Sequence, residues 1–255
     1  MSSYNLKRLL QPKSIALFGG LWIENVANQI KNSNFKGNVW PINPHRKSIA
    51  GYKCFQDISD LPGVPDTAFI GVNRTKTLEI LTKLNEVGCG GATCFAAGFS
   101  EVDKYGKQLQ KKLSKASKDM PFLGPNCYGY INYLDHIHMW PDQHGGKEVE
   151  KGVAIIAQSS NIAINLTMNT RSTPIAYVLT TGNQAKIDMS DLGLAMINDK
   201  RVTAIGIYIE GFKDIKKFEK MAFSALRSNI PIVVLKSGKT DLSKKQSFSH
   251  TASIT

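Results

Sequence analysis

The chain has 255 residues, of which 42% are hydrophobic and 20% are charged. This composition is typical of a globular protein with one large or two ordinary domains, and no apolar run approaches the roughly 20 residues of a membrane-spanning helix, so no membrane partner is expected. The formal net charge of +12 would suit a polyanionic partner, but the lysines are scattered and lack the interleaved aromatic side chains typical of single-stranded nucleic-acid binding, so no nucleic-acid partner is expected.

The first residues of the chain lack the apolar core of a signal peptide, so we expect a cytoplasmic protein. Its cysteines show no C-x-x-C spacing, which indicates neither a metal site nor a disulfide framework. Free thiols are therefore expected at Cys54, Cys89, Cys94 and Cys127.

The first half of the chain alternates short apolar runs with segments of helical periodicity. The runs predict strands at 14–18, 39–42, 67–72, 91–95 and 121–126, and the periodic segments predict helices at 24–35, 75–87 and 108–117. Such alternation indicates a parallel sheet with right-handed crossovers. We expect an α/β protein whose first domain, residues 1–134, is Rossmann-like.

The turn after the first predicted strand bears on the ligand of this domain. Gly19 and Gly20 are followed by Leu21 and Trp22 and do not form the G-x-G-x-x-G fingerprint of an NAD site. The second predicted strand ends at Asn43 and a basic cluster at 45–47, where an NAD site has an acidic residue. A phosphorylated ribose would suit this cluster, which leaves NADP, coenzyme A and a plain surface turn as alternatives.

Residues 135–150 contain three histidines and two aspartates within their first ten positions. Such a cluster could bind a metal. The proline at Pro141 and the pair Gly145 and Gly146 instead favour a linker between domains. We predict a linker and no metal site.

A second alternation follows, with predicted strands at 152–157, 175–180, 202–209 and 232–236. It predicts a flavodoxin-like α/β domain over residues 151–255, which we expect to be incomplete at its carboxyl end. Between its first strand and first helix lie Gln158, Ser159, Ser160 and Asn161. A helix N-terminus preceded by such residues can bind an anion, although an ordinary helix cap has the same appearance.

Two further residues form a candidate catalytic pair. Glu210 ends the apolar run 205–209, and His250 lies in a polar loop after the last predicted strand. A carboxylate that accepts the proton of one ring nitrogen leaves the other nitrogen free to attack phosphorus or act as a base. The alternative is a solvated histidine and a glutamate that only starts a helix.

Seven motifs together carry a family resemblance. They are WPINP at 40–44, AGFSE at 97–101, GPNCYG at 124–129, QS at 158–159, TGN at 181–183, YIEG at 208–211 and SHT at 249–251. In this order they resemble the α-type half of the NDP-forming acyl-CoA synthetases, relatives of the succinyl-CoA synthetase α subunit. The resemblance runs from about residue 14 to residue 251.

The resemblance implies a role for each matching residue. His250 would be transiently phosphorylated and Glu210 would orient its ring, while phosphate would rest on Ser159, Ser160, Asn161, Gly182 and Asn183. Coenzyme A would contact the first domain at Gly19, Gly20, Trp22, Asn43, Pro44, Arg46, Val72, Asn73, Ala97, Asn126 and Cys127.

The implied reaction interconverts a small carboxylic acid, coenzyme A and ATP with acyl-CoA, ADP and phosphate through an acyl phosphate and a phosphohistidine. ATP or ADP and Mg²⁺ would be held by a β-type ATP-grasp partner or by the rest of a longer chain, and an oligomer is expected. Ser160 and Ala252 stand where the family usually has glycine. They favour an alternative, a CoA-binding or regulatory subunit with reduced catalysis.

Overall fold

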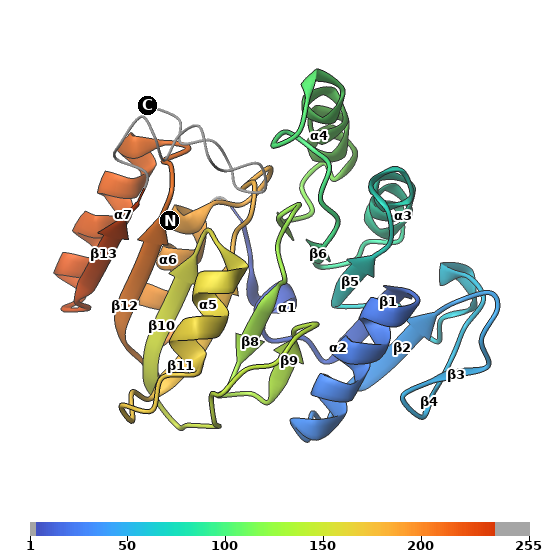
Figure 1. Ribbon diagram of the computed structural model, residues 1–255, viewed down its shortest axis with the longest axis horizontal. Helices are drawn as coiled ribbons and strands as arrows, with labels where there is room; N and C mark the ends of the chain where they lie inside the picture. Colours follow the sequence, from blue (N-terminus) through green and yellow to red (C-terminus); the bar gives the residue numbers. More distant parts are fainter. Residues whose placement is uncertain (1–3, 238–255) are drawn as a thin grey trace.

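The computed structural model describes residues 4–237 and contains two large sheets placed side by side, together with one small two-stranded sheet (Figure 1). The first has the strand order β2 (Asn38–Ile42), β1 (Ser14–Gly19), β5 (Thr67–Gly71), β6 (Ala92–Cys94) and β7 (Phe122–Leu123), all parallel. Helices α2 (Leu21–Asn32), α3 (Arg74–Glu86) and α4 (Lys104–Ala116) connect its strands. The Rossmann-like alternation is confirmed.

Short elements complete this half of the molecule. Helix α1 (Lys7–Leu10) precedes β1, and a hairpin of β3 (Ser48–Ile49) and β4 (Tyr52–Lys53) with the 3-10 helix η1 (Ile58–Asp60) links β2 to β5. The strands of the first sheet are nearly all buried because helices cover them, which explains why they are continuous apolar runs in the sequence.

The second sheet has the order β13 (Ile232–Lys236), β12 (Val202–Ile209), β10 (Gly152–Ala157), β11 (Ile175–Thr180), β8 (Tyr130–Asn132) and β9 (Ile137–Met139). The first four are parallel, as predicted, and β8 and β9 form an antiparallel hairpin against β11. Helices α5 (Ser160–Thr167), α6 (Met189–Ile197) and α7 (Ile215–Arg227) connect the parallel strands.

The segment 135–150 differs from its interpretation as a linker. It contains β9, whose three residues are all buried, and Trp140 is fully buried as well. The hairpin also packs on the first half of the chain, because Asn25 on α2 donates its side-chain amide to the carbonyl of Pro141 at 3.1 Å. The division into domains at residues 134 and 151 stays a prediction.

The hydrophobic core is continuous across the two sheets. One cluster of buried residues includes Ile15 and Phe69 of the first sheet and Ala154, Leu179 and Ile205 of the second. The two sheets therefore hold the loops at their carboxyl ends in fixed relative positions.

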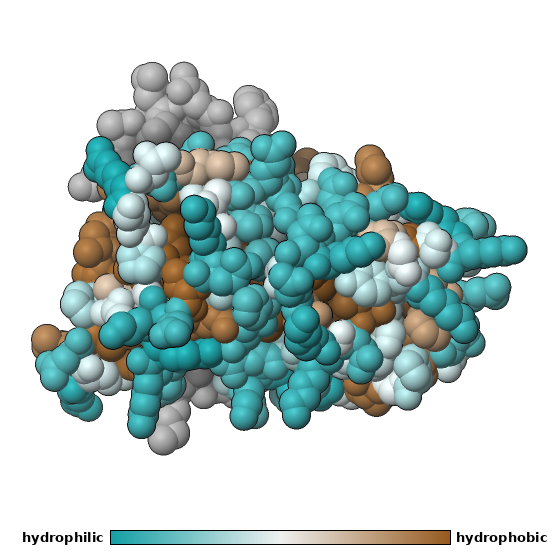
Figure 2. All heavy atoms as spheres, turned by 90° about the horizontal axis from the view of Figure 1, so that it is seen from below, coloured by the Kyte–Doolittle hydropathy of each residue, from teal (hydrophilic) through white to brown (hydrophobic). Residues whose placement is uncertain are grey.

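The second sheet has an exposed outer edge at α7 and β13. Phe223 and Leu226 on α7 are 62% and 73% exposed, and Val233 and Leu235 on β13 are 70% and 65% exposed. Figure 2 shows hydrophobic surface at the same end of the molecule, whereas charged and polar side chains cover most of the rest of this face. Among the described residues, no helix is long and apolar enough to cross a membrane.

Candidate active site

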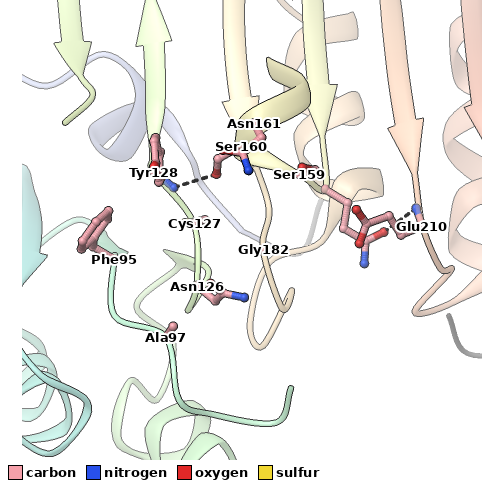
Figure 3. Close-up of a pocket in the computed structure, with 11 residues that line it drawn as sticks. Phe95, Ala97, Asn126, Cys127, Tyr128, Ser159, Ser160, Asn161, Gly182 and Glu210 are labelled. Atoms are coloured by element: carbon pink, nitrogen blue, oxygen red, sulfur yellow. Dashed lines mark hydrogen bonds between the residues drawn. The ribbon is translucent and has the colours of Figure 1, made fainter. Parts of the chain in front are cut away.

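A cavity of about 240 Å³ lies where carboxyl ends of strands from both sheets meet (Figure 3). In a doubly wound sheet, ligands bind at these ends where the strand order reverses, and the neighbours β10 and β12 form that point here. The cavity is lined by residues that follow β6, β7, β10, β11 and β12, namely Phe95, Ala97, Asn126, Cys127, Tyr128, Gln158, Ser159, Ser160, Asn161, Gly182 and Glu210.

The start of helix α5 forms one wall of the cavity. Ser159 precedes the helix in an extended conformation, and its side chain makes no capping hydrogen bond. The first N–H groups of a helix have no partner within the helix and attract anions. Ser160, Asn161 and Ser159 all line the cavity, so the predicted phosphate-binding turn lies at the cavity wall.

Glu210 follows β12, and its backbone is held by Gln158, which directly follows β10. The Oε1 atom of Gln158 accepts hydrogen bonds from the backbone N–H groups of Glu210 at 2.9 Å and Gly211 at 3.0 Å. Glu210 is only 8% exposed and lines the cavity at the side opposite Phe95 (Figure 3). Gln158, which the sequence analysis did not include among the site residues, therefore positions the predicted catalytic glutamate.

Gly182 brings the loop after β11 against the turn at 124–126. Its φ of +51° is in the left-handed region, and a Cβ atom there would collide with the backbone oxygens of Pro125 and Asn126. Two backbone hydrogen bonds of 2.9 Å also join the loops, from Asn183 to Pro125 and from Ala185 to Gly124. Glycine at this position is therefore required by close packing.

Asn183 does not line the cavity, although the resemblance implied a phosphate contact. Its side-chain amide donates to Glu101 Oε2 at 2.5 Å and to Gln110 Oε1 at 3.0 Å. Glu101 Oε1 in turn accepts from the N–H groups of Gly98 at 2.7 Å and Phe99 at 3.2 Å. Asn183 thus ties the loop after β11 to the loop after β6.

Asn126 and Cys127 line the cavity from the turn after β7. Burial raises the pKa of the Cys127 thiol to about 12, and the thiol lies 3.9 Å from the carbonyl oxygen of Cys94. A thiol of such high pKa remains protonated at neutral pH and is a poor nucleophile. Cys127 therefore forms part of the cavity wall as a buried thiol.

The predicted coenzyme A residues before Ala97 lie at the carboxyl ends of β1, β2 and β5 in the first sheet. Asn43 donates its side-chain amide to the carbonyl of Gly19 at 2.8 Å, which joins two of these ends. Arg46 makes an ion pair of 2.7 Å with Glu24, and the hydrogen bond from Arg46 holds the pKa of Glu24 below its ordinary value. Asn73 caps α3 by accepting from the N–H of Lys76 at 3.0 Å.

Trp22 connects this group of residues to the cavity. Its ring packs against Phe95 with 4.9 Å between the centroids, and Phe95 lines the cavity. Gly20, Pro44 and Val72 lie at the same strand ends. The coenzyme A contacts of all these residues stay predictions.

His250 lies outside the described residues. The part of the chain that is described contains no group of three or more His, Cys, Asp or Glu side chains able to hold a metal ion.

Two protein families match consecutive parts of the chain. The CoA binding domain matches residues 13–133, and the succinyl-CoA ligase like flavodoxin domain matches residues 150–255. The chain belongs to the NDP-forming acyl-CoA synthetases, as an α-type portion. The family resemblance found in the sequence is thereby confirmed.

Individual relatives of this α-type portion are ADP-forming enzymes. The acetate–CoA ligase [ADP-forming] of Methanocaldococcus jannaschii is 34% identical, over 98% of this chain and 36% of that enzyme. The acetate–CoA ligase [ADP-forming] II subunit alpha of Pyrococcus furiosus is 28% identical, over 98% of this chain and 55% of that subunit.

A solved structure agrees with these relatives. The dinucleotide forming acetyl-coenzyme A synthetase 1 of Ca. Korarchaeum cryptofilum, in complex with phosphate and ADP, superposes with a TM-score of 0.85 at 30% identity, covering 98% of this chain and 55% of that one. The α-type portion thus spans between about a third and a little over half of the length of these three proteins.

Proposed function

We propose that the chain is the α-type portion of an ADP-forming acyl-CoA synthetase. The observation that carries this proposal is the cavity itself. It is lined both by loops that follow strands of the first sheet, in the CoA-binding half, and by loops that follow strands of the second sheet. A coenzyme A thiol end and a phosphate can meet there. The relatives named above, which are ADP-forming acetate–CoA ligases, support the same reaction class.

The proposed reaction begins with phosphate at the start of α5. A phosphate oxygen attacks the thioester carbonyl of acyl-CoA, the C–S bond breaks, and coenzyme A leaves with a proton on sulfur. His250 then attacks phosphorus of the acyl phosphate and releases the carboxylate, and Glu210 stabilises the ring that carries the phosphoryl group. Such transfers depend chiefly on positioning and on neutralising charge, which helix N–H groups can supply.

The second half of the reaction needs ADP as phosphoryl acceptor. We assign the nucleotide and its Mg²⁺ to an ATP-grasp module, either a separate β-type subunit or further sequence of the same protein. In Pyrococcus furiosus a relative is named as an α subunit, which supports a separate partner as one arrangement.

The test is phosphoryl labelling. Together with an ATP-grasp partner, Mg²⁺ and ATP labelled in its γ-phosphate, the chain should acquire an acid-labile label that His250→Ala abolishes. Glu210→Gln should lower the labelling rate by about 10²-fold or more, in the range of electrostatic catalysis. Equal labelling of wild type and His250→Ala would show the proposed mechanism to be wrong.

A second candidate, a CoA-binding or regulatory subunit with little turnover, is favoured by the side chain at Ser160. Its hydroxyl lines the cavity where the family usually has glycine, and it accepts a hydrogen bond from the N–H of Tyr128 at 3.0 Å. The variant Ser160→Gly separates the candidates. It should leave labelling within a few-fold in an active synthetase, and it should raise labelling strongly from a low level if the serine obstructs phosphate.

A further inference from the structure

The walls of the cavity differ in character from one side to the other. Ser159, Ser160 and Glu210 line it with polar groups, whereas the rings of Phe95 and Tyr128 line the side toward the first sheet (Figure 3). A water-sized group needs about 10–15 Å³ of cavity volume. The space of about 240 Å³ therefore holds more than a phosphate group alone.

The two rings of this wall are held in place by other aromatic side chains. The Phe95 ring lies 4.9 Å from Trp22, 5.8 Å from Phe69 and 5.7 Å from Tyr128, measured between centroids. The Tyr128 ring in turn lies 5.4 Å from Trp140. Phe69 and Trp140 are fully buried, so the rings of the wall rest on a fixed support.

Backbone contacts fix the wall relative to the polar side. The N–H of Tyr128 donates to the hydroxyl of Ser160 at 3.0 Å, and Ser160 is the first residue of α5. A phosphate at the start of α5 therefore lies at a set distance from the Tyr128 ring. An acyl phosphate with its phosphate on α5 must direct its acyl group toward the remaining walls, and the large side chains among those are Phe95 and Tyr128.

We propose that Phe95 and Tyr128 recognise the acyl group, and that the protein activates carboxylic acids bearing a flat apolar group, such as aryl acids, in preference to acetate. This inference rests on the proposed function. Rigid aromatic rings offer offset-stacked or edge contacts to another ring and bury apolar surface, whereas a methyl group covers only a small part of the wall. One methylene in an apolar pocket changes selectivity by roughly ten-fold or more, so a whole ring should exceed that.

The test is calorimetric titration of the 255-residue chain with coenzyme A, acetyl-CoA and phenylacetyl-CoA. We expect phenylacetyl-CoA to bind at least about ten-fold more tightly than acetyl-CoA. The variant Phe95→Ala should reduce this ratio to within about three-fold. Phe95→Leu, which keeps an apolar side chain without the ring, should give an intermediate ratio and serves if the alanine variant does not fold. Phe223→Ala removes an exposed ring on α7 away from the cavity and should leave the ratio unchanged.

The outcomes separate this inference from the proposed function. If coenzyme A binds and the two acyl-CoA compounds bind equally, or acetyl-CoA binds more tightly, the aromatic wall does not select the acyl group and the proposed function stands. If Phe95→Ala and Phe95→Leu keep the wild-type ratio, the assignment to Phe95 is wrong. If coenzyme A itself does not bind, the proposed function is wrong, and the assignment of Phe95 and Tyr128 to the acyl group is wrong as well.

Discussion

Two regions of the molecule are held together differently. The loops around the cavity are packed against one another, whereas the turns predicted to hold the coenzyme A nucleotide are exposed. At the cavity, the turn at 124–126 and the loop at 181–185 are joined by backbone hydrogen bonds and by a glycine that admits no side chain. At the predicted nucleotide site, Leu21 and Trp22 at the start of α2 are 72% and 43% exposed, and Arg46 and Glu24 pair at the surface. The comparison indicates that the cavity loops are preorganised by packing, whereas the turns predicted to hold the nucleotide carry solvated charges.

The largest effect is expected from Gly182→Ala, which breaks the packing of the cavity loops. Alanine at φ +51° is strained, and its Cβ atom meets backbone oxygens that cannot move aside easily. We expect a loss of about 3 kcal/mol in the free energy of unfolding, measured by urea denaturation. Gly63→Ala is the matched control, because the nearest atom to its Cβ would be 3.9 Å away; a similar loss in both variants would contradict this account.

Glu101→Ala should have the next largest effect, since it removes the acceptor that joins two cavity loops. The N–H groups of Gly98 and Phe99 would lose their acceptor, and the amide of Asn183 would keep only its hydrogen bond to Gln110. Because partly buried donors are then left unsatisfied, we expect a loss of about 2 kcal/mol in the free energy of unfolding. Phosphoryl labelling should also slow, because the loop carrying Gly182 is released. Glu79→Ala, an exposed glutamate on α3, should leave both measurements unchanged.

A third prediction concerns pH and the hairpin behind the cavity. Burial, followed by the neighbouring charges of His144 and His136, lowers the pKa of His138 to about 3. The unfolded chain binds this proton near pH 6.5 and the folded chain does not, so stability is present above that pH and is lost as the pH falls toward 3. The expected loss from this residue is about 2 kcal/mol between pH 7 and pH 5.

Urea denaturation of His138→Phe at pH 7 and pH 5 checks this prediction. Between pH 7 and pH 5 the free energy of unfolding of the variant should fall by about 2 kcal/mol less than that of the wild type, because the phenyl ring does not titrate. An unchanged dependence in His138→Phe would contradict the buried, neutral state of this imidazole.

The smallest effect on stability is expected at the surface ion pair. Glu24→Gln should leave the urea midpoint nearly unchanged, because solvated pairs contribute little. It should nevertheless tighten coenzyme A binding several-fold at low salt, since Arg46 is released to meet a phosphate. Arg46→Gln should weaken binding, and both differences should shrink at high salt. If neither variant changes the affinity, Arg46 does not contact the nucleotide.

The sequence indicated several site residues for a simple reason. Ser159, Ser160, Gly182 and Glu210 directly follow apolar strands, and the carboxyl ends of parallel strands meet at one edge of a sheet. Phe95 and Tyr128 were missed because an aromatic residue next to a strand has the same sequence appearance whether it fills the core or lines a cavity. Gln158 was part of the predicted turn, but its role in holding Glu210 was not predicted. Its hydrogen bonds to the backbone at 210–211 join residues far apart in the sequence.

The parallel strands of both sheets were indicated by the sequence alone, because each is a short apolar run. For β1, β5, β6 and β11 the physical reason is burial on both faces, which requires apolar residues along the whole strand, whereas β13 is equally apolar but lies at the exposed edge. The hairpin β8 and β9 was decided only by tertiary structure. Each of its strands has three residues with a polar one among them, Asn132 or His138, and their burial results from pairing with β11 and packing on the first sheet's helix α2. The side-chain partner of Asn183 was also decided by the tertiary structure, because Glu101 lies 82 positions away in the sequence, on the loop after β6.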